Sequence, residues 1–212
     1  MNEEQRIFQG ILFAPGAEEL RAIKLRTHNL CTRYNQLFED ETMARAALLK
    51  EIFAELGEGS FLQGPMFIHY GTHTRIGRRF FGNFNLTIQD DAPVTIGDDV
   101  NFGPNVTIVT PMHPFLARER RRMLDAQGRP AHLCYARPVT IGNDVWLCAN
   151  VVVCGGVTIG DGCVIGAGSV VTHDIPADSL AAGNPCRVIR PITEADSMRN
   201  LPDILGGCSP MD

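Results

Sequence analysis

The chain has 212 residues, 44% of them hydrophobic and 20% charged, which suits one folded domain with an appendage rather than a disordered chain. The formal net charge of −5 argues against a general nucleic-acid-binding protein, because such proteins carry a surplus of positive charge. No apolar stretch reaches membrane-spanning length and no charged-then-apolar leader opens the sequence, so we expect a cytoplasmic protein without a membrane partner.

Residues 1–57 predict a helical cap. Apolar residues recur at helical spacing over residues 20–37 and again over residues 44–56, and Gly57 is expected to end the second helix. We expect helices in front of a stacked β structure to cover its first coil, because an uncovered coil exposes unpaired strand edges.

Residues 58–192 predict a solenoid, because apolar side chains recur every six residues in two registers. The two registers are Ile141, Leu147, Val153, Ile159, Ile165 and Val171, and Val145, Val151, Val157, Cys163 and Ser169. A period of six fits neither a single helix nor a single strand and is typical of hexapeptide repeats in a parallel β-helix. Each coil of such a fold buries its apolar side chains only against its neighbours.

The six-residue phase is broken twice. It slips at Gln89-Asp90-Asp91, and it is lost over residues 110–137, a charged stretch with three prolines. Two adjacent acids are usually a solvated corner, but acids displaced from a repeat are also candidate substrate contacts. Insertions in repeat proteins gather on one face, often the binding face, so we expect the inserted loop 110–137 to take part in function. Residues 193–212 form a C-terminal tail, which begins with a possible capping box from Thr193 to Asp196.

His113 is the leading candidate for catalysis. It lies at the start of the inserted loop between Pro111 and Pro114, which restrict the backbone, and histidine is the commonest general base. A loop histidine is ordinarily unremarkable, and its place at the main interruption singles this one out. At an early corner, Asn85 is expected to adopt a left-handed conformation, whereas Asn83 is a candidate for a hydrogen bond to substrate.

A second group of polar residues lies near the end of the repeat. Its members are Thr172, His173, Arg187 and Arg190. Arginine forks recognise phosphate, although arginines near a C-terminus are more often solvated. His69, His73 and His113 could be posed as three metal ligands, but their spacing is not diagnostic of a zinc site.

Several motifs in series resemble those of the galactoside/maltose O-acetyltransferase family. They are Asn83-Phe84-Asn85-Leu86-Thr87-Ile88 with Asp91, Val94-Thr95-Ile96-Gly97-Asp98, Pro104-Asn105-Val106-Thr107, His113-Pro114, Ile141-Gly142-Asn143-Asp144-Val145-Trp146, Gly156-Val157-Thr158-Ile159-Gly160-Asp161, Val164-Ile165-Gly166-Ala167-Gly168-Ser169 and Gly183-Asn184-Pro185-Cys186-Arg187. The resemblance covers nearly the whole chain, and its motifs are specific as a series.

This resemblance implies a mainly β protein, a left-handed parallel β-helix with an N-terminal helical cap and one extended loop. It also implies a homotrimer with active sites between subunits, acetyl-CoA as donor with no metal required, and a small-molecule hydroxyl acceptor. By position, His113 matches the catalytic base and Asn83 a catalytic and acceptor-binding residue, while Asp91 and His69 match acceptor-contacting positions. The positions matching CoA contacts are Ala149 and Ala167 along the pantetheine arm, and Thr172, His173, Arg187 and Arg190 around the nucleotide.

The chain departs from the family at three positions. Pro15 stands where galactoside-specific members carry an acceptor-binding Asp, His69 replaces a Ser, and His173 replaces the usual Lys beside the CoA site. The loop after His113 is also longer than expected. The first two departures leave the identity of the acceptor open.

We therefore expect an acetyl-CoA-dependent O-acetyltransferase that acts on a sugar-like hydroxyl by direct transfer in a ternary complex. The alternatives are an O-acetyltransferase for serine or an antibiotic, a γ-type carbonic anhydrase with three zinc histidines, and a non-catalytic trimeric scaffold without affinity for CoA.

Overall fold

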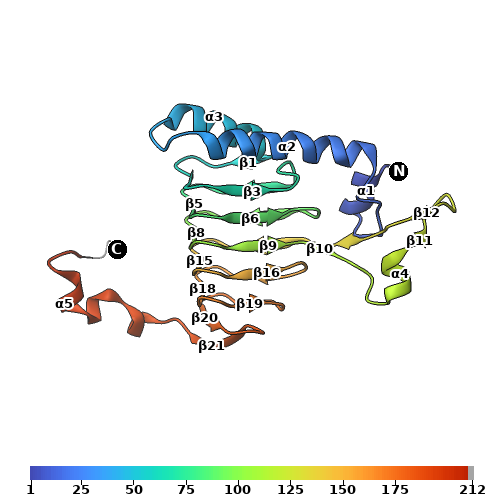
Figure 1. The fold of residues 1–212 in the computed structure, drawn as a ribbon. Coiled ribbons are helices and arrows are strands. Elements are labelled where there is room, and N and C mark those ends of the chain that lie inside the picture. The colour runs from blue at the N-terminus through green and yellow to red at the C-terminus, as the bar shows by residue number, and fades with distance from the viewer. Residues whose placement is uncertain (210–212) are drawn as a thin grey trace.

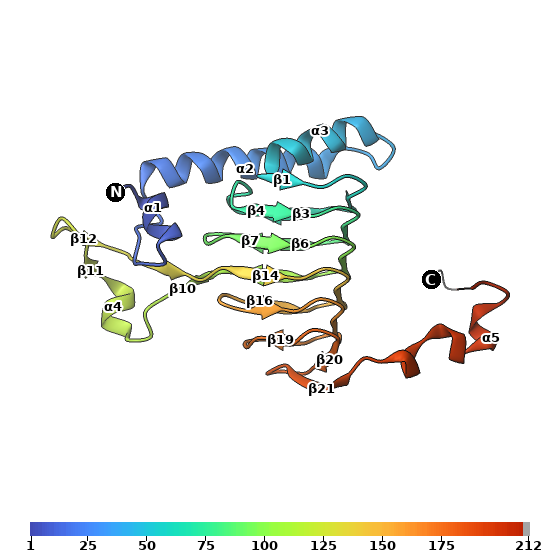
Figure 2. The ribbon, with the colours of Figure 1, turned by 180° about the vertical axis from the view of Figure 1, so that it is seen from behind.

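The body of the protein is a solenoid of stacked β coils, and helices cover its N-terminal end (Figure 1). This computed structural model describes residues 1–209. Viewed from either side, the coils are stacked one above another, with the cap at one end and the C-terminal segment leaving the other (Figures 1 and 2).

Three sheets form the three faces of the solenoid. The first face consists of β1 (Glu55–Leu56), β4 (Thr74–Ile76), β7 (Val94–Ile96), β14 (Val139–Ile141) and β17 (Thr158–Ile159). The second face consists of β2 (Phe61–Leu62), β5 (Phe81–Gly82), β8 (Asn101–Phe102), β15 (Trp146–Leu147), β18 (Val164–Ile165), β20 (Ser179–Ala182) and β21 (Arg187–Pro191). The third face consists of β3 (Met66–Ile68), β6 (Leu86–Gln89), β9 (Thr107–Val109), β16 (Val152–Cys154) and β19 (Val170–Val171). Strands of successive coils pair in parallel along each face, and the last described pair, β20 with β21, is antiparallel.

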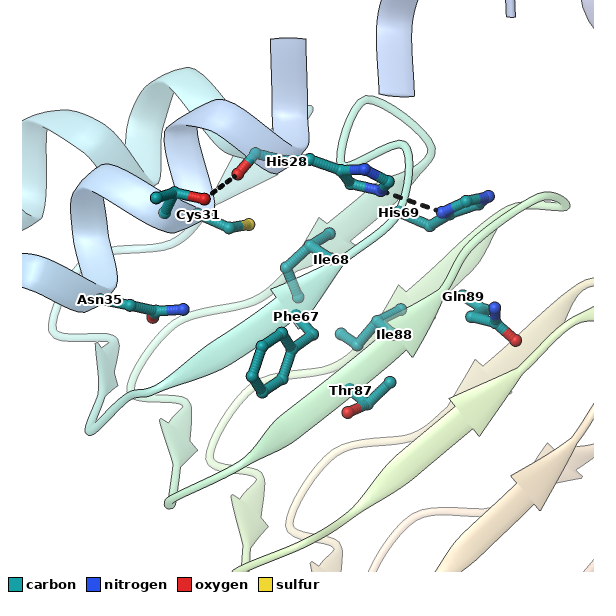
Figure 3. A pocket seen from close by; sticks show the side chains of 10 residues that line it. His28, Cys31, Asn35, Phe67, Ile68, His69, Thr87, Ile88 and Gln89 are labelled. Carbon is teal, nitrogen blue, oxygen red and sulfur yellow. Dashed lines mark hydrogen bonds between the residues drawn. The ribbon is translucent and has the colours of Figure 1, made fainter. Parts of the chain in front are cut away.

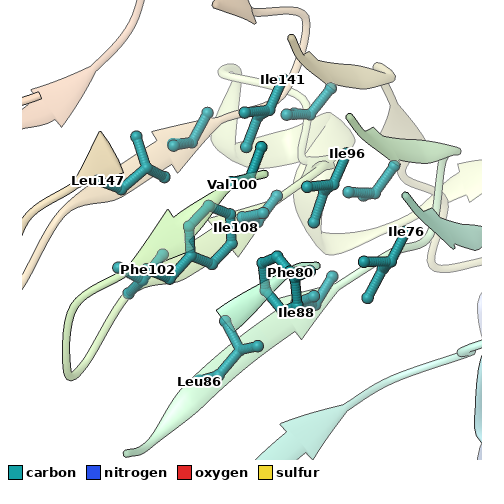
Figure 4. Packing of buried hydrophobic residues seen from close by; sticks show 14 of the residues in the cluster. Ile76, Phe80, Leu86, Ile88, Ile96, Val100, Phe102, Ile108, Ile141 and Leu147 are labelled. Carbon is teal, nitrogen blue, oxygen red and sulfur yellow. The ribbon is translucent and has the colours of Figure 1, made fainter. Parts of the chain in front are cut away.

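The core of the solenoid is built from the predicted registers. Every residue of both registers is buried, with at most 2% of its surface exposed. Parallel pairing places Ile76, Ile96 and Ile141 in line on successive coils, and Figure 4 shows these side chains stacked in the interior. The residues that recur every six positions in the sequence are therefore the ones whose side chains face the interior.

The corners of the coils explain which residues precede the second register. Asn85, Asn105, Asp144 and Asn150 all have positive φ angles of 56–61°, a left-handed conformation that Asn and Asp tolerate better than most residues. The prediction for Asn85 is confirmed. The amides of Asn85, Asn105 and Asn150 also bond to one another from coil to coil, at 3.0 Å for each pair. We call the edge between the second and third faces the asparagine edge.

Three helices precede the solenoid. They are α1 (Glu3–Phe8), α2 (Glu18–Gln36) and α3 (Thr42–Ile52). The cap consists of α2 and α3, which lie across the N-terminal end of the solenoid, whereas α1 lies to one side, beside the inserted loop (Figure 1). The two predicted helices are confirmed as α2 and α3, and α1 is additional. The prediction that Gly57 ends the second helix is wrong, because α3 ends at Ile52 and the chain is extended before Gly57. A side chain at Gly57 would overlap the backbone of the next coil, which accounts for a glycine there.

The inserted loop 110–137 leaves the edge between the third and first faces, which we call the loop edge. It contains β10 (Pro111–Met112), α4 (Ala117–Arg121), β11 (Met123–Leu124), β12 (Pro130–Ala131) and β13 (Tyr135–Ala136). Its base is closed where the Arg137 N–H donates to the Thr110 carbonyl at 3.1 Å. Phe13 and Cys134 exchange two backbone hydrogen bonds, at 2.9 and 3.1 Å, and pack in a second apolar cluster with Leu20. The loop is thus held against the N-terminal segment.

Beyond β21 the chain projects away from the solenoid (Figure 2). It forms η1 (Glu194–Asp196), η2 (Met198–Asn200) and α5 (Pro202–Leu205). The predicted capping box from Thr193 to Asp196 is confirmed. Within residues 1–209, no helix has the length and apolar character needed to cross a membrane.

Candidate active site

Eight of the ten predicted site residues lie on two separate edges of the solenoid, and the other two, Arg187 and Arg190, lie in β21. His69, Asp91, His113, Thr172 and His173 lie on the loop edge, where the third face turns toward the first. Asn83, Ala149 and Ala167 lie on the asparagine edge. The four residues of β6 separate the two edges, which corresponds to roughly 13 Å at ~3.3 Å per residue.

Asp90 is a buried structural carboxylate. It is completely buried and accepts hydrogen bonds from Tyr70 N at 2.7 Å, Gly71 N at 2.8 Å and Thr74 Oγ1 at 2.7 Å. Burial raises the pKa of Asp90, and these three hydrogen-bond donors stabilise its charged form. Of the two interpretations that the sequence left open at this phase slip, the solvated corner is therefore excluded.

Asp91 lies beside Asp90 and is also buried, at 4% exposure. Burial and then the charge of Asp90 raise the pKa of Asp91 to about 6, against the opposing influence of Lys24. A buried carboxyl group that is costly to ionise is typical of a functional site.

His69 follows β3 and is half-buried next to a second histidine, His28 of α2. His28 Nε2 and His69 Nδ1 are 3.1 Å apart and share a hydrogen bond (Figure 3). Both rings line a cavity of about 290 Å³ that also contacts Phe67 and Gln89, and a second cavity of about 630 Å³ that contacts Lys24. Burial, Lys24 and His28 lower the pKa of His69 to about 4, so the ring is neutral at physiological pH.

His73 has a structural role at the same edge. Its Nδ1 lies 3.0 and 2.8 Å from the carbonyl oxygens of Asp90 and Asp91, and its Nε2 lies 3.1 Å from a carboxylate oxygen of Glu4 in α1. The buried ring stacks on Tyr70 with the ring centroids 4.6 Å apart. Of the three histidines posed as metal ligands, His69 and His73 thus have separate partners, and no group of three metal-ligating side chains occurs within residues 1–209.

His113 directly follows β10, the first strand of the inserted loop, and its side chain is exposed. The strand pairs with β13, and the loop base is fixed to the solenoid and to the N-terminal segment. Within the described residues, no hydrogen bond or ion pair engages the His113 ring, so both ring nitrogens are free to meet a substrate.

Asn83 stands at the asparagine edge, just after β5. Its Oδ1 accepts a hydrogen bond from Phe84 N at 2.8 Å, which fixes the amide. In the described part of the chain, the amide nitrogen has no hydrogen-bond partner and remains available as a donor. Ala167 is exposed and Ala149 half-buried on the same edge.

The four residues at the far end of the repeat are only partly brought together. His173 and Arg187 line one cavity of about 500 Å³, and Thr172 Oγ1 lies 2.9 Å from His173 Nδ1. Arg190 lies outside that lining and forms a two-pronged ion pair with Asp196, at 2.6 and 2.8 Å. This pairing lowers the pKa of Asp196 to about 2.

Sequence reasoning did not identify Lys24 and His28 as site residues. Their spacing of four places them on the same side of α2, and this is the signal that could have drawn attention to them. Nothing in the local sequence indicates that His28 meets His69, which lies 41 residues later.

Comparisons with known families match most of the chain. The model of the maltose acetyltransferase hexapeptide capping motif matches residues 6–57, that of the hexapeptide repeat of succinyl-transferase residues 93–111, and that of the bacterial transferase hexapeptide (six repeats) residues 138–173. The galactoside O-acetyltransferase of Escherichia coli (strain K12) is 45% identical over 192 residues, which cover 91% of this chain and 90% of that protein.

Solved structures give the same result. A galactoside acetyltransferase in complex with coenzyme A superposes with a TM-score of 0.85 at 45% identity, covering 92% of this chain and 94% of that one. A maltose O-acetyltransferase from Clostridium difficile 630 superposes with a TM-score of 0.84 at 36% identity, covering 92% and 99%. The predicted left-handed parallel β-helix is confirmed, and the chain belongs to the galactoside/maltose O-acetyltransferase family.

Proposed function

We propose that this protein transfers the acetyl group of acetyl-CoA directly to a hydroxyl of a sugar-like acceptor, with His113 as general base. The solved relatives include one complex with coenzyme A and one with acetyl-CoA, which supports this donor. The observation that carries the proposal is the position of His113 on the loop edge. Its exposed ring lies after the coils that carry the proposed acceptor-binding residues and before the coils that carry the proposed CoA-binding residues.

The chemistry needs three contributions. A neutral hydroxyl is a weak nucleophile, so His113 takes its proton as the oxygen attacks the thioester carbonyl carbon. The carbon–sulfur bond then breaks, and the leaving thiolate receives the proton from the His113 imidazolium. The amide N–H of Asn83 is a suitable donor to the oxyanion that forms in between.

The separation of the two edges supports a site shared by two chains. Asn83 and His113 lie on edges that β6 keeps roughly 13 Å apart at ~3.3 Å per residue, too far for both to contact one carbonyl group. We propose a homotrimer in which the asparagine edge of one subunit faces the loop edge of the next. Each site then receives Asn83 from one subunit and His113 from the other.

The remaining roles follow the same division. Asp91 and His69 contact the acceptor, and the backbone at Ala149 and Ala167 contacts the pantetheine arm. Thr172, His173 and Arg187 contact the CoA nucleotide. Arg190 has a smaller share in nucleotide binding, because its guanidinium is already paired with Asp196.

The test is acetyl-CoA-dependent thiol release with a panel of glycosides, serine and hydroxylated antibiotics. His113→Ala should lower kcat by about 10²–10⁴-fold, the usual contribution of a general base. Because this side chain is exposed, the substitution should not lower the melting temperature of the protein. His132→Ala removes another exposed histidine of the same loop and should leave kcat unchanged. Full activity of His113→Ala would refute its role, and absence of both turnover and CoA binding in the unaltered protein would favour a scaffold.

A further inference from the structure

A cavity between the cap and the first coil lies away from both edges that carry the proposed active site. It has a volume of about 430 Å³, within the range of small-molecule sites. One wall is α3, which lies over β1 at the end of the stack (Figure 2). The other wall is the turn from Gly57 to Ser60, which joins β1 of the first face to β2 of the second face. The cavity therefore lies at the third edge of the solenoid, whereas His113 and Asn83 lie on the other two.

The floor of this cavity contains a buried guanidinium group, that of Arg45 in α3. The lining residues Tyr34, Leu49 and Arg45 are only 1%, 4% and 6% exposed. The central carbon of the guanidinium lies 4.6 Å from the centre of the Tyr34 ring and 5.8 Å from that of the Phe61 ring, and both rings also line the cavity. The positive charge of Arg45 is thus held against two aromatic rings at the inner end of the cavity.

Within residues 1–209, one of the three guanidinium nitrogens of Arg45 has hydrogen-bond partners. Its Nη2 donates to the carbonyl oxygens of Leu62 and Gln63 at 2.8 and 2.7 Å, and to the Tyr34 hydroxyl at 2.9 Å, which ties α3 to the first coil. In the same part of the chain, Nε and Nη1 have no hydrogen-bond partner and no carboxylate forms an ion pair with Arg45. Nε is fully buried, whereas Nη1 remains accessible from the cavity. Because neutral acceptors do not neutralise a buried charge, the structural role of Nη2 accounts for only part of this arrangement.

We propose that this cavity binds a small organic anion, with its carboxylate on Arg45 Nη1 and its apolar body against the remaining lining. A carboxylate accepts charge-assisted hydrogen bonds, which are stronger than those of a neutral acceptor. Leu49 and Leu56 line the space together with the two rings, so an apolar chain or ring gains more by burial there than a bare ion does. At the rim, the exposed side chains of Lys50 and Glu58 carry opposite charges that offset each other. The ligand class is therefore a monocarboxylate with an apolar body, and its binding does not depend on acetyl transfer.

The probe is octanoate, and its binding to the full chain is measured by isothermal titration calorimetry. Half-saturation is expected at about 0.1–1 mM, as suits a ligand of ten non-hydrogen atoms. Octanamide keeps the apolar body without the charge, and acetate keeps the charge without the body, so each should bind roughly tenfold more weakly or worse. Because the ligand contacts α3 and the first coil together, octanoate at ten times its Kd should raise the melting temperature by ~3–6 °C.

A matched pair of variants locates the site. Ala46 and Ala47 are adjacent exposed residues of α3, and of the two Ala46 lines the cavity. Ala46→Phe places a ring in the cavity and should abolish octanoate binding, whereas Ala47→Phe should leave it unchanged. Arg45→Gln removes the charge and should bind octanoate no better than octanamide; if this variant does not fold, the alanine pair and the octanamide comparison decide the question.

Three results would each overturn the inference. They are equal affinity of the unaltered protein for octanoate and octanamide, unchanged octanoate binding in Ala46→Phe, and titrations of octanoate that do not saturate. Acetyl transfer by both alanine variants should equal that of the unaltered protein, because neither residue belongs to the proposed active site. Loss of octanoate binding with turnover intact therefore tests this cavity alone, and absence of turnover with octanoate binding intact refutes only the proposed function.

Discussion

Asp91→Asn should stabilise the protein at neutral pH although it removes a proposed acceptor contact. Burial and the adjacent Asp90 raise the pKa of Asp91 from its ordinary value of 3.8 to about 6. The folded state therefore holds this proton more tightly than the unfolded state does. Stability falls as the pH rises from about 4 to about 6, and above this window the ionised group costs up to ~3 kcal/mol. Asparagine has nearly the same shape and avoids this cost.

The assay is thermal unfolding of both proteins at one fixed protomer concentration, between pH 3.5 and pH 8. Since 1 kcal/mol shifts the melting temperature of a domain of this size by about 2–4 °C, Asp91→Asn should melt ~6–12 °C higher at pH 7. The difference should shrink through the window and be smallest at pH 3.5, where the carboxyl is largely protonated in both the folded and the unfolded state. Asp144→Asn, at an exposed left-handed corner that asparagine also adopts, is the control and should change little. A lower melting temperature of Asp91→Asn at pH 7, or a difference independent of pH, would refute the reasoning.

Three further outcomes are expected. Asp90→Ala leaves three buried donors without an acceptor and should lower the free energy of unfolding by about 3 kcal/mol, measured by urea denaturation; unchanged stability would contradict the structural role of Asp90. Gly142→Ala places a methyl group 2.7 Å from the Asp161 nitrogen of the next coil and should cost about 1–3 kcal/mol in the same assay; unchanged stability would show that this contact does not restrict the position. Arg187→Ala should raise the KM of acetyl-CoA about 5- to 20-fold, as expected for a lost contact to a charged group. Arg190→Ala should change this KM less than about 2-fold, because the Arg190 side chain is already engaged by an ion pair. The reverse order would exchange the roles of the two arginines.

The solenoid could be predicted from the sequence because every coil repeats the same inward positions. The first and second registers name residues that are all buried, and the left-handed corner at Asn85 followed from its residue type alone. These features depend on local spacing and on backbone preferences that one residue carries with it.

The electrostatics of the site could not be predicted in this way. Two adjacent acids in a polar stretch look solvated, yet Asp90 is buried because its hydrogen-bond donors come from the preceding coil, 16 to 20 residues away. The partner of His69 comes from the cap, 41 residues earlier. Both contacts depend on how coils and cap are stacked, and the six-residue phase contains no information about which side chains meet at an edge.

The breaks in the repeat explain why the proposed base and acceptor-binding residues lie at the loop edge. A regular corner is restricted to residues that accept a left-handed backbone. In the ladder of Asn85, Asn105 and Asn150, the corner side chains form hydrogen bonds that hold the coils together. Catalytic side chains therefore need positions where the coil departs from its repeat. Asp91 stands at the phase slip of one coil, and the inserted loop with His113 leaves the same edge on the next coil. Asn83 lies on the opposite side of the third face, next to the ladder but outside it. Among residues 1–209 no group bonds to its amide nitrogen, which agrees with the proposal that it serves a neighbouring subunit.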